Sequence, residues 1–141
     1  MPRLASPWQW RAKPTGERML VFASRFDGRG QRFARTLLSG GGRVRKQVLA
    51  SPGALGVSIY ARPLRGKYYT LSAWADEESL RAFARSGGPH AEAIRELRNR
   101  GAVTGVLISW WQPASAGAPT WDDALRRIEA SPPGPYAGPM N

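Results

Sequence analysis

The hydrophobic and polar positions of the chain change period several times, and each change marks the border of an expected element. Alternating or short apolar runs predict strands over residues 19–26, 56–61, 67–75 and 102–112. Apolar residues at helical spacing predict helices over residues 31–39, 77–85, 90–100 and 121–130. This order is typical of an α+β protein with the ferredoxin-like split βαβ pattern, in which helices cover one face of a four-stranded antiparallel sheet.

Local signals mark the ends of the expected helices. Asp76 and Thr120 precede helical segments and are expected N-caps, because their side-chain oxygens can accept hydrogen bonds from backbone N–H groups of the first turn. Three consecutive glycines, residues 40–42, are interpreted as the end of the first helix. A short second helix within residues 43–52 would follow this break.

The pattern also divides the chain into three parts. Residues 1–18 contain prolines and no sustained period, and they predict an N-terminal arm that docks through Trp8 and Trp10. Residues 19–130 are expected to form a single ferredoxin-like α+β domain with an extra C-terminal helix. Residues 131–141 are rich in proline and glycine and predict a flexible tail.

One expected strand carries large aromatic or aliphatic side chains on both of its faces. Strand alternation places Tyr69 and Leu71 on one face and Tyr68 and Trp74 on the other. Helices cover only one face of such a sheet, so the second face needs another cover. We therefore expect a homodimer that packs sheet against sheet.

Composition narrows the classes of function. A length of 141 residues with 42% hydrophobic content suits one domain. The absence of cysteine excludes disulfides and thiolate metal sites, and a single histidine argues against a zinc site made of protein ligands alone, so no metal is expected. No apolar run approaches the roughly 20 residues that span a bilayer, and residues 1–18 show no secretory signal. We expect a cytoplasmic protein with no membrane span.

The formal net charge of +11 is concentrated in the first half of the chain. Residues 1–67 hold 14 basic and 2 acidic side chains, whereas residues 68–141 hold 7 and 8. This asymmetry is compatible with an anionic partner or with a solvated arginine-rich face. Nucleic acid is disfavoured as a partner, because no RNP-like motif is present and the aromatic residues are not interleaved with basic ones.

Three motifs resemble a known superfamily. They are SPGALGVS before the second strand, YYTLSAWAD leading into a helix, and Pro89-His90 after that helix. Residues 19–112 are thereby similar to the dimeric α/β-barrel superfamily of antibiotic-biosynthesis monooxygenases, and within it to a bacterial group near spheroidene monooxygenase. The resemblance implies a homodimer with a pocket between sheet and helices in each subunit. It does not extend to the Asn/Trp/His arrangement of the haem-degrading branch, since the only internal asparagine is Asn99.

The better-known members of this superfamily oxidise aromatic substrates with O2 and need no metal or flavin. The resemblance therefore implies a cofactor-independent monooxygenase, or a related tailoring enzyme of secondary metabolism, that acts on an aromatic or polyene-like small molecule. The alternative is a protein on the same fold that binds haem or a lipophilic ligand without turnover.

His90 and Arg25 are the candidate catalytic residues. His90 titrates near neutral pH and begins a predicted helix, where the dipole favours neutral imidazole, so it is expected to act as a general base or, in the alternative, as a haem ligand. A histidine that only caps its helix is the competing interpretation. Arg25, at the end of the first strand, is expected to hold a substrate carboxylate or phenolate. An exposed strand-end arginine without a role in binding is the competing interpretation.

The candidate substrate-binding residues are four aromatic residues and one serine: Tyr60, Tyr68, Trp74, Trp110 and Ser24. The rings would form the flat apolar wall of a pocket, and the serine would hydrogen-bond a ligand. For the rings, the competing interpretation is packing in the core or in a dimer interface. For the serine, it is a hydroxyl whose hydrogen bonds are satisfied within the sheet.

Overall fold

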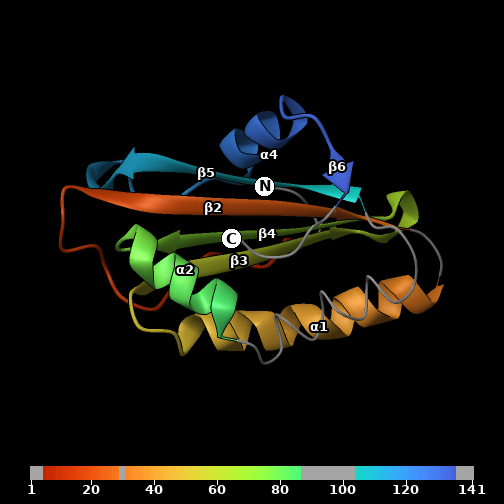
Figure 1. Ribbon diagram of the computed structural model, residues 1–141, viewed down its shortest axis with the longest axis horizontal. Coiled ribbons are helices and arrows are strands. Elements are labelled where there is room, and N and C mark those ends of the chain that lie inside the picture. Colours follow the sequence, from red (N-terminus) through yellow and green to blue (C-terminus); the bar gives the residue numbers. More distant parts are fainter. Residues whose placement is uncertain (1–4, 29–30, 87–103, 136–141) are drawn as a thin grey trace.

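The computed structural model describes residues 5–28, 31–86 and 104–135 (Figure 1). Within these ranges, one antiparallel sheet contains six strands: β1 (Gln9–Trp10), β2 (Arg18–Asp27), β3 (Ala54–Arg62), β4 (Lys67–Trp74), β5 (Thr104–Pro113) and β6 (Gly134–Pro135). The helices of the same ranges are α1 (Gln31–Leu49), α2 (Glu77–Arg85) and α4 (Trp121–Glu129), with the 3₁₀ turns η1 (Pro63–Arg65) and η2 (Ala114–Ala116).

The order of the strands confirms the predicted fold class. Across the sheet the order is β1-β3-β4-β2-β5-β6, and all neighbours are antiparallel. The four long strands, in the order β3-β4-β2-β5, form the sheet of a ferredoxin-like split βαβ unit. The two-residue strands β1 and β6 at its edges were not predicted, because so short a segment carries no detectable alternation.

The sheet is covered on both faces by its own chain. Figure 1 shows α1 and α2 on one side of the strands and α4 on the other. On the α1 side, Val44 and Val48 pack against buried residues of β2, β3 and β4. On the α4 side, Ala124 and Ile128 pack with Leu71, while Trp8 and Trp10 lie at the border of this cluster. The face that was expected to need a second subunit is therefore packed against α4 and the segment around β1.

The predicted break of the first helix is wrong, because α1 runs without interruption from Gln31 to Leu49. Glycine in a helix costs about 1 kcal/mol relative to alanine, and this cost favoured a stop. Packing against the sheet outweighs it, since Val44 and Val48 are 7% and 2% exposed. A Cβ on Gly41 would lie 3.4 Å from Ile59 Cγ2 of β3, which is van der Waals contact, so α1 packs on the sheet at its glycines as well.

The predicted N-caps of the shorter helices are confirmed. Asp76 Oδ1 accepts a hydrogen bond of 2.7 Å from the backbone N–H of Ser79. Thr120 Oγ1 accepts one of 3.2 Å from the backbone N–H of Asp123. These side chains satisfy donors that the first helical turn cannot pair internally.

Ser58 of β3 connects two distant segments on the α4 side of the sheet. Its hydroxyl donates a hydrogen bond of 2.6 Å to the carbonyl oxygen of Ser6 and accepts one of 2.9 Å from Trp121 Nε1. Trp8 lies directly over β3, where a Cβ on Gly56 would come within 2.5 Å of its ring.

In the described part of the chain, none of the helices combines the length and apolar content that crossing a bilayer demands.

Candidate functional site

A row of hydroxyl groups lies on the sheet face that α1 and α2 cover. Ser24 of β2 and Thr70 of β4 are cross-strand neighbours, and their hydroxyl oxygens share a hydrogen bond. Ser72, two residues further along β4, accepts a hydrogen bond of 2.9 Å at Oγ from Trp74 Nε1. Ser24 and Ser72 are only 2% and 4% exposed. Three hydroxyls thus stand on a face whose other members are mainly apolar.

Among the residues that the structure describes, this row retains hydrogen-bond donors without an acceptor. In the pair of Ser24 and Thr70, one hydroxyl donates to the other, and the second keeps its proton for another acceptor. Ser72 uses Oγ as an acceptor, and the described residues provide no acceptor for its proton. Buried polar groups are normally satisfied, so spare donors at this position suit a ligand that carries oxygen atoms.

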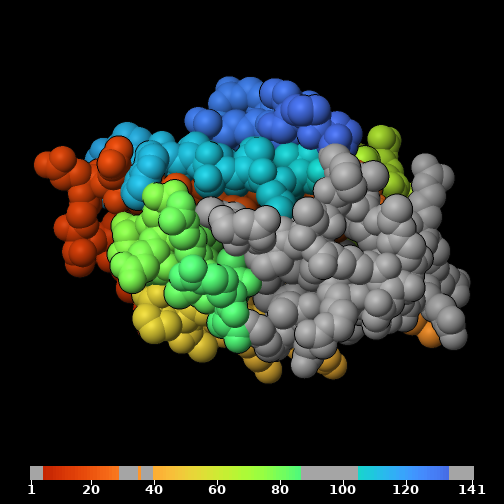
Figure 2. Space-filling model, viewed as in Figure 1, coloured from red at the N-terminus to blue at the C-terminus, as the bar shows by residue number. Residues whose placement is uncertain are grey.

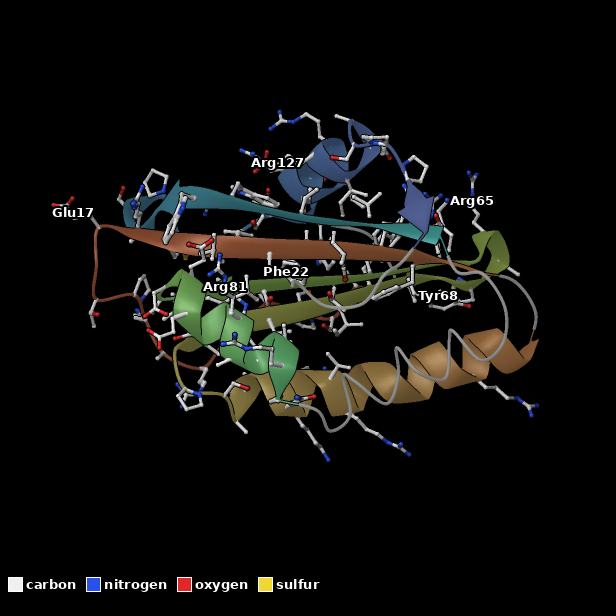
Figure 3. All side chains as sticks on the ribbon, viewed as in Figure 1. Glu17, Phe22, Arg65, Tyr68, Arg81 and Arg127 are labelled. Atoms are coloured by element: carbon white, nitrogen blue, oxygen red, sulfur yellow. The ribbon has the colours of Figure 1, made fainter. Side chains whose placement is uncertain are left out.

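Aromatic rings extend the same face. Figure 3 shows Phe22 of β2 and Tyr68 of β4 between the strands and α1. The ring of Trp74 lies against Phe83 of α2, with centroids 5.1 Å apart. Burial raises the pKa of Tyr68 above its ordinary value, so its phenol stays protonated across the neutral range. Flat rings beside a few hydroxyl donors form a surface suited to a planar small molecule.

Arg25 lies on the opposite face of the sheet. Its side chain is 11% exposed and its Nε stands 2.9 Å from Asp27 Oδ1, while Nη2 donates to Oδ2 of the same carboxylate at 3.1 Å. Lys67 Nζ also contacts Oδ1 of Asp27, at 3.3 Å. The guanidinium is thus engaged by a carboxylate of its own strand, and the structure does not bring it to the hydroxyl row.

Tyr60 and Trp110 also lie on the α4 side. The ring of Tyr60 stacks on Tyr69 at 5.0 Å and meets Trp121 edge-on at 5.5 Å. Arg127 of α4 lies over Trp110, with its Cζ 4.5 Å from the ring centroid. These rings belong to the packing beneath α4, whereas Ser24, Tyr68 and Trp74 share the other face. The candidate set is therefore divided between two faces, and His90 lies outside the described residues.

Two members of the row were not among the candidates. Thr70 and Ser72 carry a signal in the sequence, because strand alternation places them on the same face as Tyr68 and Trp74. The contact between Thr70 and Ser24 depends on the register of two distant strands and has no local signal. Phe22 likewise enters the site through this register, since it pairs with Ser72.

Two cavities lie on the α4 side, near the start of that helix. One of about 310 Å³ is lined by Trp8, Ser58, Pro119, Thr120, Trp121 and Asp122. The other, of about 290 Å³, is lined by Trp110, Trp111, Gln112, Pro113, Ala116, Ala118, Thr120, Asp123 and Arg127.

Within the described ranges, no three Asp, Glu, His or Cys side chains gather as a metal site requires.

Comparison with solved structures identifies the architecture. SnoaB, a cofactor-independent oxygenase from Streptomyces nogalater, is 17% identical, and the match covers 75% of this chain and 98% of SnoaB with a TM-score of 0.51. The chain has the SnoaB fold. A conserved protein of unknown function from Bacteroides thetaiotaomicron is 10% identical over 69% of this chain and 100% of that chain, with a TM-score of 0.56. No family model and no curated protein matches the sequence.

Proposed function

We propose that the protein is a cofactor-independent monooxygenase whose aromatic or polyene-like substrate binds between the sheet and the helices α1 and α2. The observation that carries this proposal is the row of hydroxyls formed by Ser24, Thr70 and Ser72, of which Ser24 and Ser72 are buried and whose spare protons meet no acceptor among the described residues. The fold shared with SnoaB supports it, since that protein is a cofactor-independent oxygenase. The homodimer, the cytoplasmic location, the role in secondary metabolism and the relation to the spheroidene monooxygenase group are parts of the same proposal.

In this proposal the substrate itself supplies the electrons that reduce O2: one oxygen atom enters the substrate, and the other leaves as water with the two hydrogens that the substrate loses. Removal of a proton from the substrate leaves a negative charge that is delocalised onto its oxygen substituents. The hydroxyls of Thr70 and Ser72 donate to these oxygens and so stabilise the charge as it develops. Phe22 and Tyr68 hold the ring plane, and the fully buried Trp74 behind them keeps water away. His90 is proposed as the base.

Oxygen uptake in the presence of phenolic, hydroquinone and polyene compounds tests the proposal. Thr70→Val removes one hydroxyl at constant shape, and we expect it to lower kcat/KM by about tenfold, as the loss of one hydrogen bond to a charged group would. Ser115→Ala in η2, at an exposed serine, is the matched control and should leave kcat/KM unchanged. Equal turnover of Thr70→Val and the native protein would contradict the role of the row. Ligand binding without oxygen uptake would instead support the alternative of a haem- or lipophile-binding protein.

A further inference from the structure

The end of the sheet at the turn η1 carries cations with few carboxylates to balance them. The sequence contains no acidic residue between Asp27 and Asp76, and nine basic residues lie in this interval. The N–H of Gly28 donates to the carbonyl of Gly66 at 2.8 Å, so the chain leading into α1 meets η1. Figure 1 shows the start of α1 and the yellow-green turn η1 at the same, right-hand end. Arg35, near the start of α1, is exposed.

The carboxylates of the described residues are placed elsewhere or already engaged. Asp27, at the end of β2 next to η1, contacts Arg25 Nε at 2.9 Å and Lys67 Nζ at 3.3 Å. At the opposite end of the sheet, exposed carboxylates accompany the cations: Glu17, Asp76, Glu77 and Glu78. Within the described ranges, charge is therefore mixed at that end and mainly positive at η1.

The turn η1 exposes a leucine to solvent. The side chain of Leu64 is fully exposed, and η1 contains no buried residue. Pro63 opens the turn with its fixed φ, and Gly66 closes it with a φ of 65° and an N–H that donates to the carbonyl of Pro63 at 3.1 Å. Figure 2 shows yellow-green atoms of this turn at the right-hand surface of the molecule. A turn with a constrained backbone thus holds Leu64 outward.

Three cations flank this leucine. Arg62 and Lys67 are register partners of β3 and β4 at the base of the turn, and Arg65 follows Leu64 and is exposed. Among the described residues, neither Arg62 nor Arg65 forms a salt bridge. An aliphatic tip flanked by cations matches the layers of an anionic bilayer, in which hydrocarbon lies beneath a plane of phosphates. The long stems of arginine and lysine let their charges stay at that plane.

We propose that η1 docks the protein on the surface of a bilayer that contains anionic lipids, with Leu64 below the headgroups and its three flanking cations among the phosphates. A nucleic acid would also attract the cations, but leucine has no planar face on which a base can stack. Free phosphate would use the cations and leave Leu64 in water. The bilayer is the partner that uses both parts of the turn.

Docking at η1 would bring the candidate site close to the bilayer. Tyr68 and Thr70 follow Lys67 on β4, so the site begins next to the docked end of the sheet. A polyene-like substrate dissolves in hydrocarbon and could pass from the bilayer to the site over this short distance. That route rests on the proposed function, whereas the docking itself does not.

Cosedimentation with vesicles tests the docking. At low salt, we expect the native protein to sediment with vesicles of phosphatidylcholine and phosphatidylglycerol in equal parts, and to stay in the supernatant with phosphatidylcholine alone. Leu64→Asn should lower the partition coefficient about tenfold, because it removes a leucine from the hydrocarbon. Arg65→Gln should lower it about fivefold, as the loss of one cation near the surface would. Both side chains are exposed, so the fold should persist, which far-UV circular dichroism verifies.

Arg81→Gln is the matched control. It removes the same charge from an exposed arginine of α2, the helix that follows the end of β4 remote from Lys67 (Figure 3). Charges separated by more than about 10 Å of salt solution are largely screened from one another. The partition coefficient of Arg81→Gln should therefore equal that of the native protein.

Several results would overturn the docking. They are a native protein that does not sediment with the anionic vesicles, equal sedimentation with phosphatidylcholine alone, undiminished sedimentation of Leu64→Asn, and equal losses in Arg65→Gln and Arg81→Gln. Single-stranded DNA is the comparison probe: if Leu64→Asn weakened its binding as much as it weakens vesicle binding, η1 would be assigned to a nucleic acid instead.

The proposed enzyme activity fails separately. Vesicle binding without oxygen uptake would leave the docking standing and contradict the activity, whereas oxygen uptake by a protein that does not bind vesicles would do the reverse.

Discussion

Gly42→Ala tests whether α1 is continuous through its three glycines. Position 42 lies inside the helix, and a Cβ built there meets no heavy atom within 4 Å. Gly42 also has no positive φ, in contrast to Gly53 and Gly66, so alanine can adopt its backbone conformation. The substitution therefore adds no clash and no strain. It changes only the helix propensity and the entropy of the unfolded chain.

The magnitude follows from these two terms. Alanine is favoured over glycine inside a helix by about 1 kcal/mol. We therefore expect Gly42→Ala to raise the free energy of unfolding by about 0.5–1 kcal/mol. In a chain of this size, such a change raises the midpoint of thermal unfolding by about 2–4 °C. If the helix ended at residues 40–42, the substitution would instead lower the free energy of unfolding. It would then replace a glycine in a left-handed cap, a backbone conformation that strains alanine.

Urea and thermal unfolding followed by circular dichroism at 222 nm measure this change. Gly53→Ala is the matched control, since Gly53 has a φ of 82° and its Cβ would lie 2.0 Å from Ser79 Oγ. We expect it to destabilise the fold while Gly42→Ala stabilises it. A loss of stability in Gly42→Ala would refute the continuous helix.

Three further predictions concern other parts of the molecule. The pKa of Asp76 is lowered mainly by the hydrogen bond from the backbone N–H of Ser79 and further by the one from the Ser79 hydroxyl. The ionised carboxylate therefore stabilises the fold at pH values above its pKa in the unfolded chain, about 3.9, and this stabilisation is lost as the pH falls below that value. Asp76→Ala should thus lower the free energy of unfolding, measured with urea at neutral pH, by about 1 kcal/mol. The same difference between variant and native protein in strong acid would contradict this account. Burial raises the pKa of Tyr68, so the free energy of unfolding should fall as the pH rises above about 10. The absorbance of the Tyr68 phenolate should appear at a higher pH in the folded than in the unfolded chain. Ionisation of Tyr68 at the ordinary pKa would argue against its burial. Gly56→Ala would place a Cβ 2.5 Å from the Trp8 ring, and it should shift tryptophan emission to the red and speed proteolysis before residue 12, whereas unaltered emission would show that Trp8 is not seated there.

The accuracy of the sequence-based interpretation depended on the range of the interactions involved. Helix α2 was predicted closely, because its cap Asp76 and its buried residues Leu80 and Phe83 lie within a few positions of one another. Helix α1 was predicted to stop at residues 40–42, where local propensity opposes a helix that packing against β3 sustains. The fold class was predicted, because the order of strands and helices along the chain is typical of a ferredoxin-like sheet.

The candidate site illustrates a different limit. Strand alternation alone separates Ser24 from Arg25, because neighbouring residues point to opposite faces. It does not indicate which face carries α1 and which carries α4. The contact of Ser24 with Thr70 additionally needs the register between β2 and β4, which is set by the whole sheet. The sequence therefore indicated which side chains of one strand share a face, but not which side chains of different strands come into contact at the site.

The hydrogen bonds of Ser58 have a consequence for synthesis of the chain. Its partners Ser6 and Trp121 are 52 residues earlier and 63 residues later in the sequence. When β3 leaves the ribosome it can join the segment around Ser6 at once, whereas α4 does not yet exist. The α4 side of the sheet, with Tyr60 and Tyr69, therefore stays accessible during translation of the intervening residues. A nascent chain stalled before residue 121 should present this aromatic surface to chaperones, and completion of α4 should release it.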